Sequence, residues 1–204
     1  INIPTLDTEL RSDGIFVIKL YSFSANSASL FRDALKKFSD SSSDKLILDL
    51  RGNPGGYLDS AVDITSWFLP SGKTVVTEDY GDGKKPEIFR SKGYNIFNDK
   101  LKLVILIDGG SASASEIVAG ALHDQGIAKL VGAQSFGKGS VQEPIKVTPD
   151  TLLKITVAKW LTPNGNLIEK KGLTPDYPVE ITRKDLDAKK DPQMNKAVEI
   201  LLGN

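Results

Sequence analysis

Three serines in one short run of small residues are the candidate nucleophiles of this chain. Ser111, Ser113 and Ser115 alternate with alanines between two apolar segments. The apolar run 101–107 before them predicts a buried strand, and the apolar periodicity of residues 117–122 after them predicts a helix. The serines therefore lie on a strand-to-helix turn, where N–H groups at the helix N-terminus favour negative charge. Acyl-transfer chemistry needs a nucleophile beside such an oxyanion site.

The same residues also fit a purely structural role. Ser113 and Glu116 match the Ser-x-x-Glu capping box that precedes many helices. Most serines at such positions only cap a helix. Ser111 and Ser115 are rival candidates for both roles. The turn by itself therefore leaves open whether its serine is a nucleophile or a helix cap.

A nucleophilic serine needs a base, and the single histidine of the chain is badly placed to be one. His123 follows Ser113 by ten residues, near the far end of the same predicted helix. That separation is about 15 Å along a helix axis, so a Ser-His-Asp triad is not expected. Lysine is an alternative base, because burial lowers its pKa.

Lys138 stands in a glycine-rich segment with more than one interpretation. Gly132, Gly137 and Lys138 come within one residue of the phosphate-binding P-loop pattern. Gly139 stands where that pattern requires a Ser or Thr to hold magnesium, and residues 140–147 predict a strand, whereas a P-loop begins a helix. Phosphate binding is therefore rejected. An ordinary exposed lysine in a turn is the structural alternative to a catalytic base.

A second glycine-rich turn follows another predicted buried strand. Gly55 and Gly56 end the segment 51–56, directly after the apolar run 45–50. Adjacent glycines permit close backbone approach and unusual dihedral angles, so their N–H groups are candidate oxyanion donors. A tight strand-to-helix connection explains the same pair equally well.

Strands and helices alternate through the first 132 residues, which predicts an α/β fold with crossover connections. The predicted strands are 14–20, 45–50, 73–80, 87–90, 101–107, 130–132, 140–147 and 151–161, the last two forming a hairpin around Pro149 and Asp150. The predicted helices begin at Asn26 or Ser27 and cover 58–69, 114–125 and 195–202. Residues 1–13 are predicted to be irregular, and residues 91–100 receive no assignment.

Composition removes several classes of function. The 26 basic and 26 acidic residues cancel, so no basic field favours nucleic acid or anionic membranes. The chain has no cysteine, which excludes disulfides and thiolate metal sites and fits an extracytoplasmic location. No apolar run approaches the ~20 residues of a transmembrane helix, and the first residue, Ile1, suggests a mature or trimmed fragment.

Taken together, these motifs resemble the carboxy-terminal processing peptidases, also called tail-specific proteases. The matching motifs are Asp49-Leu-Arg-Gly-Asn-Pro-Gly-Gly56, Gly110-Ser-Ala-Ser-Ala-Ser-Glu116, Ala119-Gly-Ala-Leu122, Phe136-Gly-Lys-Gly-Ser-Val-Gln142, Thr162-Pro-Asn-Gly165 and Gly172-Leu-Thr-Pro-Asp176. The resemblance covers residues 14–202. It implies a crotonase-like (ClpP/crotonase) α/β core of ββα units with a C-terminal β-hairpin. It also implies a serine endopeptidase that cleaves proteins or peptides near their C-termini and requires no metal or organic cofactor.

The resemblance gives each candidate residue a role. Ser113 looks like the nucleophile of a Ser/Lys dyad, and Lys138, 25 residues later, looks like its general base. The resemblance implies that Gln142 holds the lysine in place. The N–H groups of Ala114 and of Gly55 or Gly56 are implied to bind the oxyanion. Asp124 and Glu116 receive only supporting roles. A base at neutral pH must lose its proton. We therefore expect Lys138 to be buried under Phe136, unpaired with carboxylates and within hydrogen-bond reach of Ser113 Oγ.

One departure from the family concerns domain organisation. Family members usually carry a PDZ domain that reads the C-terminus of the substrate, and residues 1–13 cannot hold one. We expect a single catalytic domain over residues 1–204, with 73–98 as a small hairpin or cap insertion and the PDZ domain either removed or naturally absent. The expected partners are protein or peptide substrates on the periplasmic or cell-envelope side, without nucleic acid and without stable membrane insertion by this chain.

Two rival functions belong to the same core. A catalytically silent peptide-binding or scaffold protein would keep the fold, although the presence of both Ser113 and Lys138 favours the enzyme. Crotonase-type thioester chemistry is the third hypothesis.

Overall fold

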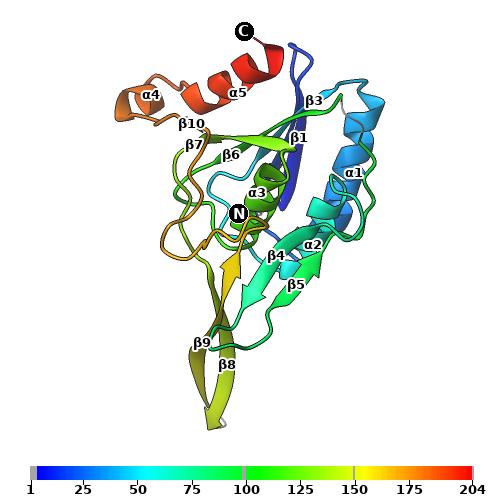
Figure 1. The fold of residues 1–204 in the computed structure, drawn as a ribbon. Coiled ribbons are helices and arrows are strands. Elements are labelled where there is room, and N and C mark those ends of the chain that lie inside the picture. Colours follow the sequence, from blue (N-terminus) through cyan, green and yellow to red (C-terminus); the bar gives the residue numbers. More distant parts are fainter. Residues whose placement is uncertain (1–3, 98–99, 149, 204) are drawn as a thin grey trace.

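The computed structural model describes residues 4–97, 100–148 and 150–203, which form two β-sheets with covering helices (Figure 1). The larger sheet has six strands in the order β1-β2-β3-β6-β7-β10. In chain order they are β1 (Leu6–Leu10), β2 (Phe16–Leu20), β3 (Lys45–Asp49), β6 (Lys102–Ile107), β7 (Ala128–Gly132) and β10 (Tyr177–Pro178). From β2 to β10 all neighbouring strands are parallel, whereas β1 runs antiparallel to β2.

Helices cover both faces of this sheet, which is why its central strands are almost continuously apolar. One face is covered by three helices, α1 (Ser27–Asp40), α2 (Leu58–Ser66) and α3 (Ala114–Asp124). The other face is covered by α5 (Pro192–Leu202). Side chains alternate along each strand. In β6, Leu103 and Ile105 enter the larger core, while Val104 and Leu106 enter the smaller core under α5.

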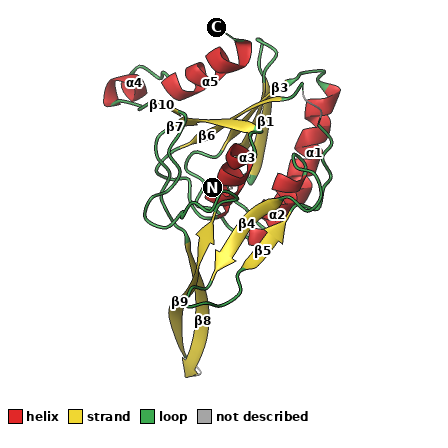
Figure 2. Cartoon of the chain, viewed as in Figure 1, coloured by secondary structure: helices red, strands yellow, loops and turns green. Residues whose placement is uncertain are grey.

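The smaller sheet is antiparallel, with the strand order β5-β4-β9-β8. Its strands are β4 (Thr74–Asp79), β5 (Glu87–Arg90), β8 (Ser140–Thr148) and β9 (Thr151–Leu161). β8 and β9 pair as a long hairpin that extends away from the rest of the molecule (Figure 2). Because β4 pairs with β9, the segment 74–90 belongs to this sheet.

The predicted strands and helices are confirmed with shifted ends, and one prediction is wrong. Residues 1–13 are not wholly irregular, because β1 joins the sheet edge through its backbone while most of its side chains stay exposed. The last helix begins at Pro192 rather than residue 195, since Asp191 caps it by accepting a hydrogen bond from the N–H of Met194 at 2.9 Å.

Some elements lie beyond what the sequence predicts. These are the short helix α4 (Arg183–Asp187) and the two-residue strand β10. Residues 1–3, 98–99 and Pro149, which belong to predicted segments, lie outside the described residues. None of the helices in the described ranges is long and apolar enough to cross a membrane.

Candidate active site

Four loops meet at one edge of the large sheet, because parallel strands end on the same side. They follow β2, β3, β6 and β7. Three of them carry the predicted site residues: the glycine loop (residues 50–57), the serine turn (residues 108–113) and the lysine loop (residues 133–139). Asp108 joins the first two, since its Oδ1 accepts hydrogen bonds from the N–H groups of Gly52 at 2.8 Å and Gly110 at 2.9 Å.

Asn53 fixes the glycine loop against the serine turn. Its buried side chain donates from Nδ2 to the carbonyl of Leu20 at 2.7 Å and accepts at Oδ1 from the N–H of Gly55 at 2.9 Å. Its own carbonyl accepts from the N–H of Ala112 at 3.0 Å and from the hydroxyl of Ser115 at 2.9 Å. One buried residue thereby links β2, the glycine loop and the serine turn.

The three serines of this region differ in exposure and in what their hydroxyl groups do. The hydroxyl of Ser111 donates to the carbonyl of Leu50 at 2.8 Å, and Ser115 donates to Asn53, so both hold backbone together from fully buried positions. Ser113 is partly exposed and its side chain faces the N–H of Glu116 in a capping box, but its hydroxyl donates a hydrogen bond to no residue in the described ranges. Of the three, only Ser113 therefore has a hydroxyl proton without an acceptor among the described residues.

The backbone of Ser113 has a conformation that side-chain-bearing residues rarely adopt, with φ 54° and ψ −115°. Such a conformation persists only where the surrounding structure enforces it. Here the N–H of Ser113 donates to Oε2 of Glu116 at 2.9 Å, as the capping-box pattern predicts. On the other side, Gly55 is so close that a Cβ added to it would lie 2.8 Å from the Cβ of Ser113.

Two backbone N–H groups near Ser113 have no acceptor within the part of the chain that the structure describes. They belong to Ala114, the first residue of α3, and to Gly56. The N–H of Gly55 already donates to Asn53. Of the two glycines that the sequence leaves open, Gly56 is therefore the one with an available donor.

Glu116 is fully buried, and its carboxylate joins the serine turn to the lysine loop. Oε2 accepts from the N–H groups of Ser113 at 2.9 Å and Lys138 at 3.0 Å, and Oε1 accepts from the hydroxyl of Ser135 at 2.5 Å and the N–H of Gly137 at 2.7 Å. Four donors thus compensate the burial of this charged group. The capping-box pattern indicates only the bond to Ser113, and no sequence signal indicates the other three.

The prediction that Lys138 is buried is wrong for this structure. Its side chain is exposed, and Nζ forms neither a hydrogen bond nor an ion pair with any described residue. Phe136, the expected apolar cover, is itself 65 % exposed. The reason is that the lysine loop is held through its backbone, by Glu116 and by close packing of Gly139 on Glu169, which leaves both side chains in solvent.

Two further predicted site residues form no hydrogen bond with Ser113 or Lys138. Gln142 is exposed on β8, opposite Thr156 and beside a register shift. Asp124 ends α3 and accepts a hydrogen bond from the N–H of Asn164 at 2.9 Å, so it holds the turn at residues 162–165.

His123 also stands apart from the serine turn, at the opposite end of α3. Its Nε2 lies 3.2 Å from Oδ1 of Asp176, whose other oxygen accepts from the N–H of Leu130 at 2.8 Å. Desolvation opposes the charge of Asp176, but these two partners outweigh it and lower the pKa of the carboxyl. The expectation that His123 is not the base of Ser113 agrees with this position.

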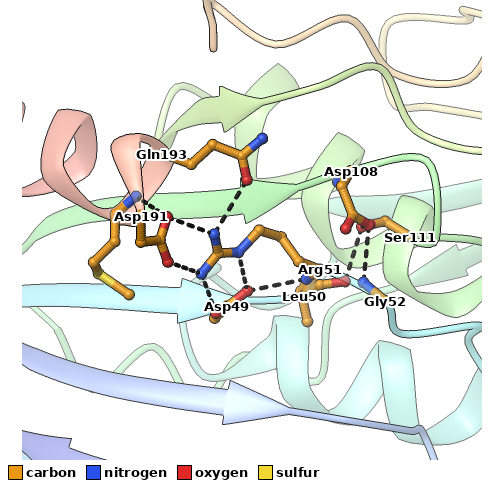
Figure 3. A network of polar contacts seen from close by, with 9 residues as sticks. Asp49, Leu50, Arg51, Gly52, Asp108, Ser111, Asp191 and Gln193 are labelled. Atoms are coloured by element: carbon orange, nitrogen blue, oxygen red, sulfur yellow. Dashed lines mark hydrogen bonds and ion pairs between the residues drawn. The ribbon is translucent and has the colours of Figure 1, made fainter. Parts of the chain in front are cut away.

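An ion-pair network ties the glycine loop to the C-terminal helix (Figure 3). Arg51 lies between the carboxylates of Asp49 at 2.8 Å and Asp191 at 2.9 Å, and it also donates to Oε1 of Gln193 at 3.1 Å. Burial opposes the charge of Arg51, but the two carboxylates outweigh it and raise its pKa. Desolvation likewise opposes the charge of Asp191, yet Arg51 and the N–H of Met194 lower its pKa. The sequence does not predict this pairing of residues 140 positions apart.

Comparison with known proteins gives the chain close relatives. It is 35% identical over 181 residues to the carboxy-terminal processing protease CtpA of Bacillus subtilis (strain 168), an alignment that covers 89% of this chain and 38% of that protein. It is 41% identical over 170 residues to a probable CtpA-like serine protease of Staphylococcus aureus (strain COL), covering 80% of this chain and 33% of that protein. The matched part of the chain therefore spans only about a third of the length of these relatives.

The fold and the family pattern agree with these relatives. A photosystem II D1 C-terminal processing protease superposes with a TM-score of 0.79 at 26% identity, covering 88% of this chain and 49% of that one. The sequence pattern of Peptidase family S41 matches residues 14–179. The resemblance inferred from the motifs is thus confirmed, and the chain belongs to peptidase family S41.

Proposed function

We propose that this chain is the catalytic domain of a serine endopeptidase, with Ser113 as nucleophile and Lys138 as general base. The observation that carries the proposal is the contrast among the three serines, of which only Ser113 donates its hydroxyl proton to no described residue. Ala114 follows Ser113 in the chain, and Gly56 follows Gly55, which packs against Ser113, so their unengaged N–H groups are candidates for the oxyanion site. Acyl transfer requires such donors beside the nucleophile, where they bind the oxyanion.

In the proposed reaction, neutral Lys138 accepts the hydroxyl proton of Ser113 while Oγ bonds to the carbonyl carbon of the substrate. The carbonyl oxygen gains the negative charge, which the N–H groups of Ala114 and Gly56 stabilise. Lys138 then gives its proton to the leaving amine as the C–N bond breaks. A water molecule attacks the resulting ester with Lys138 accepting its proton. The ester C–O bond breaks, Ser113 recovers a proton from Lys138, and the acid leaves.

This route requires the side chain of Lys138 to leave solvent. One oxygen of Glu116 accepts hydrogen bonds from the N–H groups of both Ser113 and Lys138, which fixes the two backbones relative to each other. The side chain of Lys138 can then change rotamer without movement of its backbone. A substrate lying across Ser113 would displace water from the amine and favour its neutral form. In this proposal Gln142 orients the amine after that movement, and Asp124 acts only by holding the turn 162–165.

The proposed substrates are unfolded proteins or peptides cut near their C-termini, in keeping with relatives named as carboxy-terminal processing proteases. We also propose that residues 1–204 form one catalytic domain on a crotonase-like core of ββα units. The relatives are more than twice as long as this chain. In this proposal a PDZ domain that captures the substrate would belong to a segment outside residues 1–204. An extracytoplasmic, cell-envelope location is proposed on the same kinship and on the absence of cysteine.

The test is incubation of the chain with a chemically unfolded protein, followed by mass spectrometry of the fragments. We expect the wild-type chain to produce defined fragments and Ser113→Ala to produce none, with unchanged circular dichroism. Equal cleavage by both chains would show that Ser113 is not the nucleophile. Absence of cleavage by the wild type, together with stoichiometric binding of the unfolded protein, would favour the scaffold hypothesis.

A further inference from the structure

We propose that Phe136 determines specificity by contacting an apolar side chain on the leaving-group side of the cleaved bond. The inference rests on the proposed function of Ser113 and Lys138. It narrows the substrate class to peptides with a large apolar residue directly after the scissile bond.

Phe136 combines an exposed side chain with a backbone that is hydrogen-bonded on both sides. Its side chain is 65 % exposed, the highest fraction among the large hydrophobic residues of the described chain. Its ring packs against no other aromatic ring in the described ranges. Yet its N–H donates to the carbonyl of Ser111 at 3.0 Å, and Ser135 and Gly137 on either side are bonded to Glu116. Because the backbone is already fixed, a substrate side chain can contact this ring without a further cost of ordering the loop.

The position of the ring relative to the dyad indicates which part of the substrate it meets. The backbone of Phe136 is bonded to the residue two places before Ser113, and Phe136 itself lies two places before Lys138. In the proposed reaction the leaving amine takes its proton from Lys138, so that nitrogen must come within hydrogen-bond reach of the lysine. The residue that begins at this nitrogen therefore lies against the lysine loop, where Phe136 is the exposed apolar group.

An apolar side chain on the substrate residue directly after the cleaved bond would have two effects. It would bury the ring of Phe136, which disfavours a polar residue in the same place. It would also remove water from around Lys138, which favours the neutral amine that the reaction needs. We expect discrimination between a large apolar and a small polar residue of about tenfold in kcat/KM, the range typical of apolar pockets.

Tyr57 provides a matched control. It is 63 % exposed, but it lies on the glycine loop, after Gly56, and not on the lysine loop. The experiment first maps cleavage sites in an unfolded protein by mass spectrometry. Two peptides are then made from the best site, with leucine or serine directly after the cleaved bond, and kcat/KM is measured for each.

For the wild-type chain we expect the leucine peptide to be cleaved about tenfold more efficiently than the serine peptide. Phe136→Ala should bring this ratio close to one, Phe136→Leu should keep most of it, and Tyr57→Ala should keep all of it. The inference is overturned if the wild type has no preference, if Phe136→Ala keeps the ratio, or if Tyr57→Ala loses it equally. These results differ from failure of the proposed function, in which neither peptide is cleaved and a serine-reactive probe does not label Ser113.

Discussion

Replacement of Glu116 by glutamine should uncouple the serine turn from the lysine loop. Each carboxylate oxygen accepts two hydrogen bonds, whereas glutamine keeps one oxygen and turns the other into a donor. If the amide nitrogen replaces Oε2, the N–H groups of Ser113 and Lys138 both lose their acceptor. If it replaces Oε1, the N–H of Gly137 loses its acceptor and the hydroxyl of Ser135 must turn away.

The cheaper of these two arrangements still leaves one buried N–H group unpaired, at about 1–3 kcal/mol, and weakens two charge-assisted bonds. We therefore expect Glu116→Gln to lower the free energy of unfolding by about 2–3 kcal/mol. In urea this corresponds to a midpoint lower by about 1 M. Peptide cleavage should fall as well, because the positions of Ser113 and Lys138 depend on the same carboxylate.

Glu143→Gln is the matched control, since Glu143 is exposed on β8. Its free energy of unfolding should differ from that of the wild type by less than about 0.5 kcal/mol. If Glu116→Gln were as stable and as active as Glu143→Gln, the buried carboxylate would not be the link between the two loops. The reasoning from its four hydrogen bonds would then be refuted.

Two further perturbations test the glycine loop and the network behind it. Gly55→Ala puts a Cβ 2.8 Å from the Cβ of Ser113 at a φ of +95°, so cleavage should be lost. Gly81→Ala, at a φ of +66° with nothing within 4 Å of the added Cβ, introduces backbone strain alone and should stay active. Equal activities of the two variants would contradict the close packing of Gly55 on Ser113. Asp191→Asn removes the ion pair with Arg51 but keeps a residue that can cap α5. Because the pKa of Asp191 is lowered by folding, its stabilising effect is present above its unfolded pKa of about 3.9 and is lost as pH falls through the lower folded value. Unfolding curves of the two chains should therefore differ at pH 6 and approach each other as the pH falls below the unfolded pKa of about 3.9. A difference that persists unchanged in acid would exclude the ion pair as its cause.

The parts of the fold that sequence reasoning predicts are those with a local cause. β3 and β6 are continuous apolar runs because both faces of the sheet are covered, and α3 is recognisable from its apolar stripe after the serine turn. The hairpin of β8 and β9 follows from β-branched runs on either side of a turn. In each case the signal lies within the element itself.

What the sequence does not predict depends on distant partners. β1 owes its conformation to pairing with β2, since its exposed side chains carry no clear apolar alternation. Arg51 meets Asp191 only because α5 returns to the sheet, and no spacing rule connects them. Such contacts are set by tertiary packing, which local propensity does not encode.

In the candidate site, the serine turn is predicted from the sequence, whereas the exposure of the lysine loop is not. Residue type and spacing leave three serines open, and the family resemblance selects Ser113. The structure supports that choice, because Ser111 and Ser115 both donate their hydroxyl protons to backbone carbonyls. The expectation that Lys138 is buried fails, because the backbone bonds to Glu116 decide where its loop lies.

Covalent labelling of the chain by a fluorophosphonate, followed by peptide mapping, tests the central claim most directly. We expect the label to be attached to Ser113 and to neither Ser111 nor Ser115. We also expect Lys138→Arg to reduce the labelling rate at least about a hundredfold, since a guanidinium group does not deprotonate in proteins and cannot act as the base. Labelling of Lys138→Arg at the wild-type rate, or attachment of the label to Ser111 or Ser115, would contradict the Ser113–Lys138 dyad.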